Sequence, residues 1–364
     1  MLKQFTTEDE RIHIFGRTKR GKETPLFWTG SGFEILTDSP EVWIDFELNY
    51  DLHEYWVRVD LDGKTLQRVL LGKDQKTLCA FRNLPEDAKR RVRFLIETQP
   101  MRLDPVRYFL LKGVRLNGGL YELPPKTMNI EFVGDSLTTG EGLAGGQKLL
   151  MGGTTSYGLE GHYGLTIADE LNADFRFLSQ SGWGVYTSWD NCADRVMPKY
   201  YDETCSILDR DVNEKFGAFE KNDFKAWKAD IVVINLGSND GFALDNPGWK
   251  DEKTGVTYKQ ERNAYGGLTE QSAGNFENAC IAFLEKVRER NPDAEIFWAY
   301  GMCDHRMAPY VEKAVELYRE RSGDRHTKYI SLPCTTYINR GSNGHPGVKD
   351  HRLAADILLK EIRG

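Results

Sequence analysis

The chain has 364 residues, of which 40% are hydrophobic and 28% charged, and its formal net charge is −7. This length favours two domains with sizeable cores, and the composition is that of an ordinary soluble protein. The negative charge argues against nucleic acid as a partner, because no basic field for binding phosphates is expected.

The first residues, MLKQFTTEDERIHIFGR, lack the apolar core of a signal peptide, and no later segment approaches the length of a membrane span. Six cysteines are scattered without a CxxC pair, which is typical of free thiols in a reducing compartment. We therefore expect a cytoplasmic location and no membrane partner. No His/Cys cluster has the spacing of metal ligands, so the sequence predicts no metal and no cofactor.

Up to about residue 120 the chain is a series of short segments that alternate apolar and polar residues, as half-buried antiparallel strands do. The clearest are EVWIDFEL (41–48), YWVRVDLDG (55–63) and RVRFLIET (91–98). The dipeptide at 62–63, Asp-Gly, is a hairpin signal. We predict a β-sandwich of the jelly-roll type over residues 1–122. The basic run KRRVR (89–93) is interpreted as the solvated face of a strand rather than a nucleic-acid site.

The segment LPPKT (123–127) is interpreted as a linker, and after it the pattern changes. Strongly apolar runs suited to buried parallel strands alternate with amphipathic helical stretches. The runs are MNIEFVG (128–134), DFRFLS (174–179), DIVVINLG (230–237), EIFWAYG (295–301) and KYISL (328–332). This alternation predicts, for residues 127–364, an α/β domain with a parallel sheet covered by helices on both faces.

Ligands of such sheets bind beyond the carboxyl ends of the strands, so the residues after each apolar run are the candidates. Ser136 follows the first run, Gly182 the second, Asn239 the third, and His345 precedes the final helix. Each alone could be an ordinary turn or helix-capping residue.

Together these four residues supply what acyl transfer needs. A serine nucleophile needs a base near neutral pH, which histidine provides. A glycine amide and an asparagine side chain can donate hydrogen bonds to the tetrahedral oxyanion. The sequence therefore favours Ser136, His345, Gly182 and Asn239 as a catalytic set.

The blocks Gly134-Asp135-Ser136-Leu137, Gly182, Gly237-Ser238-Asn239-Asp240 and His345-Pro346 resemble, in this order, the blocks of the SGNH/GDSL hydrolase family. The preceding sandwich is similar to the jelly-roll domain of carbohydrate esterase family 2, as are the motifs GRT near residue 16, FWTGSGFEI (27–35) and VDLDG (59–63). The resemblance implies a serine esterase that removes O-acetyl groups from plant-derived oligosaccharides or polysaccharides, such as xylan and mannan, through an acyl-enzyme on Ser136.

One position departs from the wider family, which has an aspartate three residues before the histidine. Here that position is Ser342, followed by Asn343 and Gly344. Members of carbohydrate esterase family 2 are known to work with a Ser-His dyad, so the resemblance implies that a backbone carbonyl, from Gly344 or a near neighbour, holds the ring of His345. The Asn343 side chain is the alternative, and His351 is interpreted as structural.

For substrate binding we expect Trp183, which follows the oxyanion glycine, together with Asp135 and Gly237 of the motif blocks. Further candidates are Trp189, Trp249 and Trp298, although core packing is the favoured interpretation of Trp298. The glycine-rich segment 142–158 is expected to form a wall of the acyl pocket. Two alternatives stay open: a lipase or thioesterase of the same fold, and a noncatalytic carbohydrate-binding protein. An oligomer is possible.

Overall fold

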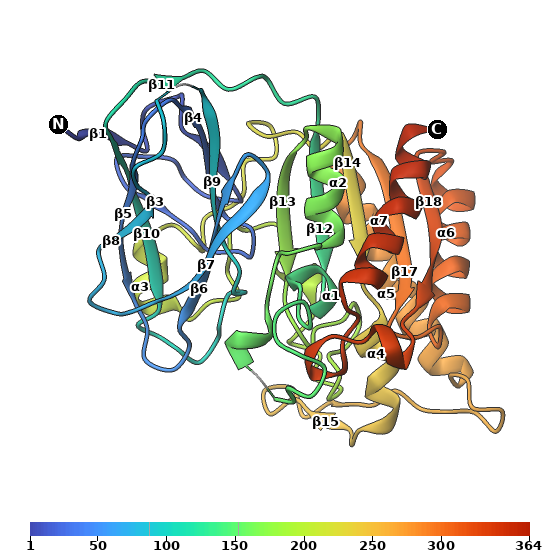
Figure 1. The fold of residues 1–364 in the computed structure, drawn as a ribbon. Coiled ribbons are helices and arrows are strands. Elements are labelled where there is room, and N and C mark those ends of the chain that lie inside the picture. Colours follow the sequence, from blue (N-terminus) through green and yellow to red (C-terminus); the bar gives the residue numbers. More distant parts are fainter. Residues whose placement is uncertain (87, 152) are drawn as a thin grey trace.

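The computed structural model describes residues 1–86, 88–151 and 153–364. An N-terminal pair of antiparallel sheets lies beside a C-terminal α/β unit, drawn in blue to teal and in green to red respectively in Figure 1. This confirms the predicted fold class. The predicted linker falls between the last strand of the first unit, which ends at Tyr121, and the first strand of the second, which begins at Asn129.

The N-terminal unit is a sandwich of two sheets, with strand orders β1-β10-β5-β8 and β11-β4-β9-β6-β7; β3 joins the first through β10 and β2 the second through β4. Apolar side chains of both sheets form one buried cluster between them. The strands are β1 (Lys3–Thr6), β2 (His13–Phe15), β3 (Thr24–Pro25), β4 (Gly32–Thr37), β5 (Val42–Asn49), β6 (Tyr55–Leu61), β7 (Lys64–Leu71), β8 (Thr77–Phe81), β9 (Arg90–Ile96), β10 (Tyr108–Leu116) and β11 (Leu120–Tyr121).

The predicted hairpin joins β6 to β7. Asp62 and Gly63 both have positive φ, at 49° and 78°, as a two-residue turn of this kind requires. The prediction from the Asp-Gly dipeptide is confirmed.

The C-terminal unit has a five-stranded parallel sheet of order β13-β12-β14-β17-β18. Its strands are β12 (Asn129–Gly134), β13 (Asp174–Ser179), β14 (Ile231–Asn235), β17 (Glu295–Met302) and β18 (Thr327–Cys334), so each of the five predicted apolar runs is a strand. The helices are α1 (Ser136–Thr139), α2 (Tyr163–Leu171), α3 (Arg210–Lys215), α4 (Ser238–Phe242), α5 (Glu270–Arg290), α6 (Ala308–Ser322) and α7 (Val348–Arg363), and a small hairpin pairs β15 (Trp249–Lys250) with β16 (Thr257–Tyr258).

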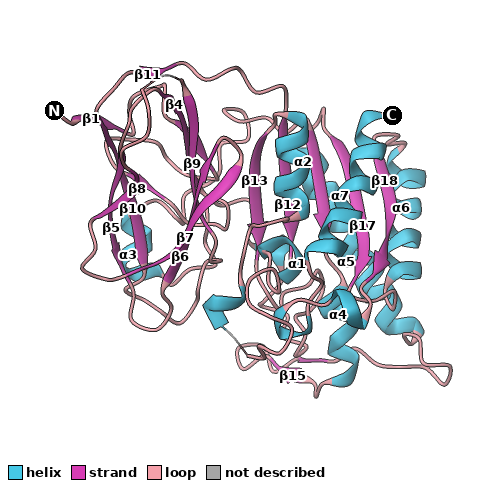
Figure 2. Ribbon diagram, viewed as in Figure 1, coloured by secondary structure: helices cyan, strands magenta, loops and turns pink. Residues whose placement is uncertain are grey.

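The two faces of the parallel sheet are covered by different helices (Figure 2). Phe132 of β12 points to the face covered by α2 and α7, whereas its neighbour Val133 points to the face covered by α5 and α6. Successive strand residues point to opposite faces, so a strand buried on both sides is mostly apolar. Among the described residues, no helix has the length and apolarity that crossing a bilayer requires.

Buried ion pairs join the two units. Arg17 of the N-terminal unit is fully buried and donates to both carboxylate oxygens of Glu131 on β12, at 3.0 and 3.1 Å. Arg93 of β9 is 4% exposed and pairs with Asp60 and, across the interface, with Asp169 of α2. The interpretation of KRRVR as a solvated strand face is therefore wrong for Arg93, because that side chain faces the second unit rather than solvent.

Two histidines are fully buried, one at the start of α2 (His162) and one within α7 (His351). His162 caps α2, where its Nδ1 accepts the N–H of Leu165 at 3.3 Å, and burial lowers its pKa to about 3. Burial also lowers the pKa of His351 well below its usual range, in line with the structural role predicted for it. Because the unfolded chain binds these protons near pH 6.5 and the folded chain does not, stability is retained above that pH and lost as the pH falls below it.

We expect the His162→Asn variant to lose less stability in acid than the wild-type protein. Asparagine keeps a side-chain acceptor at the cap but does not titrate. Between about pH 7.5 and about pH 5.5, the wild-type free energy of unfolding should fall by about 1.4 kcal/mol more than that of the variant. Urea unfolding at both pH values measures the difference, since other buried groups titrate in both proteins. Equal losses would contradict the prediction.

Candidate active site

The four predicted catalytic residues lie at the carboxyl edge of the parallel sheet, the edge where α1 and α4 are labelled in Figure 1. Ser136 follows β12 and is the first residue of the short helix α1. Asp135 caps that helix, with its Oδ1 accepting the N–H of Leu137 at 3.1 Å. The cap fixes the turn, so the serine, 8% exposed, is held at the end of the strand.

His345 lies on the turn between β18 and α7. Its Nδ1 is 3.1 Å from the backbone carbonyl oxygen of Asn343, which accepts the Nδ1–H and leaves Nε2 as the basic nitrogen. A backbone carbonyl is the acceptor that the sequence predicts. The Asn343 side chain, the alternative, instead donates to Glu141 at 2.5 Å.

The segment 142–158, of which residue 152 lies outside the described residues, packs on this histidine turn. The Ser342 N–H donates to the carbonyl of Gly142 at 3.0 Å, and the Asn343 N–H donates to the carbonyl of Leu149 at 2.7 Å. A Cβ atom on Gly142 would lie 2.5 Å from the Cβ of His345, so only glycine allows this approach. The segment therefore holds the histidine turn close to the helix that carries Ser136.

Three N–H donors come from the turns that follow β12, β13 and β14. Within the described residues, the amides of Ser136 and Gly182 donate no hydrogen bond. The first amides of a helix have no partner inside it, so the Ser136 amide is available for an anion. It adds a third donor to the Gly182 amide and the Asn239 side chain that the sequence predicts.

The Asn239 side chain is held in place by two acceptors. Its Nδ2 lies 2.9 Å from the carbonyl oxygen of Trp183 and 3.2 Å from Oδ2 of Asp135. Burial, with the charges of Asp240 and Glu141, raises the pKa of Asp135 to about 7. Through these two hydrogen bonds, Asn239 connects the turn that carries Ser136 to the turn that carries Gly182. To donate to an oxyanion, its Nδ2 would replace the hydrogen bond to Asp135 with one to the oxyanion.

Asp240 is a structural partner of the glycine turn. It is fully buried, and its carboxylate accepts three backbone N–H groups, from Val185 at 2.9 Å, Tyr186 at 2.8 Å and Thr187 at 2.9 Å. Burial raises its pKa to about 6, although these hydrogen bonds act in the opposite direction. This one carboxylate therefore fixes the loop that follows Gly182.

The three residues predicted to contact substrate are buried. Trp183 is 3% exposed and packs in the core against Tyr200, with ring centroids 5.0 Å apart. Asp135 is fully buried. Gly237, with φ 123°, faces the ring of Tyr300, which a Cβ there would approach to 3.1 Å. All three are therefore packed in the core beside the candidate site, and their contact with substrate stays a prediction.

An exposed aromatic ring lies close by. Trp189 is 46% exposed, and its backbone N–H donates to the carbonyl of Gly182 at 3.1 Å. Its indole ring lies beside Gly182, 2.9 Å from where a Cβ on that glycine would be. Of the two tryptophans near the oxyanion glycine, Trp189 is the one whose face can receive a sugar ring.

Sequence reasoning missed two contacts. Gln99, from the sandwich, accepts the N–H of Ser181 at 2.7 Å and donates to the hydroxyl of Tyr157 at 2.8 Å, so the N-terminal unit supports the turn that carries Gly182. Glu141 lies 3.7 Å from Nε2 of His345. The position of Glu141, five residues after Ser136, is the one signal in the sequence that could have indicated this contact. Nothing in the sequence indicates Gln99.

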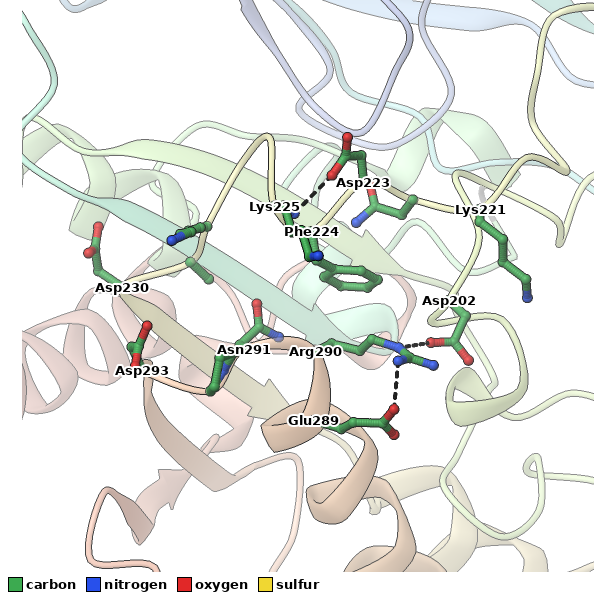
Figure 3. Close-up of a pocket in the computed structure, with 14 residues that line it drawn as sticks. Asp202, Lys221, Asp223, Phe224, Lys225, Asp230, Glu289, Arg290, Asn291 and Asp293 are labelled. Carbon is green, nitrogen blue, oxygen red and sulfur yellow. Dashed lines mark hydrogen bonds and ion pairs between the residues drawn. The ribbon is translucent and has the colours of Figure 1, made fainter.

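A cavity of about 810 Å³ lies elsewhere in the molecule (Figure 3). Asp230, which lines it, directly precedes β14, so the cavity lies at the amino end of the parallel sheet. Arg290, also on its wall, is paired with Asp202 at 2.7 Å. None of the predicted catalytic residues lines this cavity, so it is separate from the candidate active site.

Several known proteins are similar to this chain over most of its length. The structure of an acetyl xylan esterase, Est2A, from the rumen bacterium Butyrivibrio proteoclasticus superposes with a TM-score of 0.96 and 33% identity, covering 100% of this chain and 98% of that one. The acetylxylan esterase / glucomannan deacetylase of Cellvibrio japonicus is 24% identical over 370 residues, 98% of this chain and 92% of that protein.

A family two carbohydrate esterase from Cellvibrio japonicus has the same fold, with a TM-score of 0.76 at 18% identity over 100% of this chain and 97% of that one. The cellulase/esterase CelE of Acetivibrio thermocellus is 25% identical over 349 residues, 92% of this chain, but this chain spans only 37% of CelE. The model of the GDSL-like Lipase/Acylhydrolase family matches residues 132–355, more than half of the chain. The chain therefore belongs to the GDSL-like lipase/acylhydrolase family, as its motif blocks predict.

Proposed function

We propose that this protein is a carbohydrate esterase that removes O-acetyl groups from plant-derived oligosaccharides and polysaccharides of the xylan and mannan type. The observation that carries the proposal is the 33% identity to an acetyl xylan esterase along the whole chain. The glucomannan deacetylase activity in the name of a second relative supports mannan as a further substrate.

The geometry supports a two-step acyl transfer. Ser136 Oγ attacks the acetyl carbonyl carbon while its proton passes to Nε2 of His345, whose Nδ1–H is held by the Asn343 carbonyl. The oxyanion accepts hydrogen bonds from the amides of Ser136 and Gly182 and from Nδ2 of Asn239. The proton then passes to the sugar oxygen as its bond to the acetyl carbon breaks, and water releases acetate from the serine by the same route.

A second candidate, hydrolysis of longer acyl esters, is favoured by apolar side chains near the histidine turn. Leu150 and Met151 are 68% and 89% exposed, and the Met151 N–H donates to the side chain of Asn343. Tyr337 and Ile338 are 75% and 86% exposed on the segment that follows β18. Apolar surface of this kind can receive an acyl chain as well as a sugar face.

The two candidates are distinguished by acyl-chain length. We expect kcat/KM for p-nitrophenyl acetate to exceed that for the octanoate ester by roughly 10-fold or more, since a pocket built for acetyl rejects added methylenes. Acetate release from acetylated xylan and acetylated glucomannan oligosaccharides, followed by NMR, should show turnover of both. Preference for octanoate, with no acetate released from either oligosaccharide, would favour the lipase instead.

A further inference from the structure

Glu141 lies close to both Ser136 and His345. Its N–H donates to the carbonyl of Ser136 at 3.0 Å, which places it just after helix α1. Its side chain is only 10% exposed, and its Oε2 is 3.7 Å from Nε2 of His345. A carboxylate therefore faces the ring nitrogen that receives the serine proton.

The same carboxylate also supports the other side of the imidazole. Its Oε1 accepts the side-chain N–H of Asn343 at 2.5 Å, and the backbone carbonyl of Asn343 holds Nδ1 of His345 at 3.1 Å. Glu141 thus contacts Nε2 directly and reaches Nδ1 through Asn343.

Burial makes the charge of Glu141 significant. A buried carboxylate is costly unless a cation or hydrogen bonds compensate it. Among the described residues, His345 is the one side chain within ion-pair distance that can become a cation. The separation of 3.7 Å is longer than a hydrogen bond, so Nε2 stays available to the serine hydroxyl.

We propose that Glu141 is a positioning residue that supplies the counter-charge to the imidazolium of His345, a role that other serine hydrolases give to an aspartate at Nδ1. The inference rests on the proposed function. When Ser136 Oγ bonds to the acyl carbon and its proton moves to Nε2, the ring becomes positive 3.7 Å from the carboxylate. The charge is stabilised from the nucleophile side of the ring, while the carbonyl of Asn343 fixes the tautomer.

Substitution by glutamine separates this role from a structural one. In Glu141→Gln, the side-chain oxygen can still accept from Asn343, but the negative charge is lost. We expect kcat for p-nitrophenyl acetate to fall roughly 10- to 100-fold, with KM within a few-fold of wild type. This loss is smaller than that caused by a change that gives the catalytic histidine the wrong tautomer. Glu141→Asp, which keeps the charge, should recover part of the loss.

A second readout is independent of the acyl substrate. The rate at which a fluorophosphonate inactivates the enzyme reports activation of Ser136, so it should fall in Glu141→Gln by a factor similar to that for kcat. If the wild type reacts with the fluorophosphonate but releases no acetate, the proposed substrate is wrong and the role of Glu141 is still tested.

The matched control is Glu160→Gln, because Glu160 is an exposed glutamate that pairs with Arg58, outside the site. Its kcat and inactivation rate should equal those of the wild type. Wild-type values of both in a folded Glu141→Gln protein would overturn the proposal. So would a loss confined to Glu141→Ala and accompanied by a lower melting temperature, since that pattern describes a purely structural residue.

Discussion

The Ser136→Ala variant should lose esterase activity by roughly 10³-fold or more while folding normally. In the proposed mechanism the hydroxyl oxygen of Ser136, the first residue of α1, forms the acyl-enzyme. The side-chain oxygen makes no hydrogen bond within the described residues, so its removal costs the fold little. Initial rates with p-nitrophenyl acetate, together with a thermal melt, measure the two effects.

Ser181→Ala is the matched control for this change. Ser181 lies two residues after the neighbouring strand β13, and its hydroxyl is 3.3 Å from that of Thr139. The same atom is removed close to the site, yet kcat should stay within a few-fold of wild type. Mass spectrometry of the wild type, quenched during turnover, should show one added acetyl group that Ser136→Ala lacks. Near-wild-type turnover by Ser136→Ala would exclude the serine mechanism.

The fold could be predicted from the sequence because its signals are periodic and local. The run that became β14 is apolar at successive positions from Ile231 to Ile234, as burial on both faces of a parallel sheet requires. Once the sheet is parallel, the carboxyl ends of its strands share one edge. That rule is sufficient to bring Ser136, Gly182 and Asn239 together.

The direction of individual side chains at the turns was not predictable in this way. Trp183 and Trp189 both follow the oxyanion glycine, but tertiary packing places the first in the core and exposes the second. Sequence position alone does not distinguish them. Arg93 has the alternation of a solvated strand residue, but the second unit covers it.

The partners of buried polar groups were also hidden, because they are remote in sequence. Glu141 accepts from Asn343, which is 202 positions away, and Gln99 accepts from Ser181, 82 positions away. Such contacts form only when the two units and their loops are assembled. The family blocks identify the candidate reacting groups in the sequence, whereas the residues that hold those groups in place can be identified only in the complete fold.

The Asn239→Ala variant should lower kcat by roughly 10²- to 10³-fold with a smaller effect on KM, because an oxyanion donor acts mainly in the transition state. The substitution also removes the bond to the carbonyl of Trp183, which holds the glycine turn. A loss of kcat alone would therefore leave open whether the donor or the loop was lost. A second variant is needed that loosens the same loop and keeps the donor.

Asp240→Asn is that variant. The Asp240 carboxylate accepts hydrogen bonds from the three backbone amides of residues 185–187. The asparagine side chain has a nitrogen in place of one oxygen, so it cannot accept all three hydrogen bonds. We expect Asp240→Asn to lower the melting temperature more than Asn239→Ala does, while its kcat falls less. If the two variants lose kcat in proportion to their loss of stability, or if Asn239→Ala raises KM with kcat unchanged, then Asn239 only supports the loop. The oxyanion would then depend on the amides of Ser136 and Gly182.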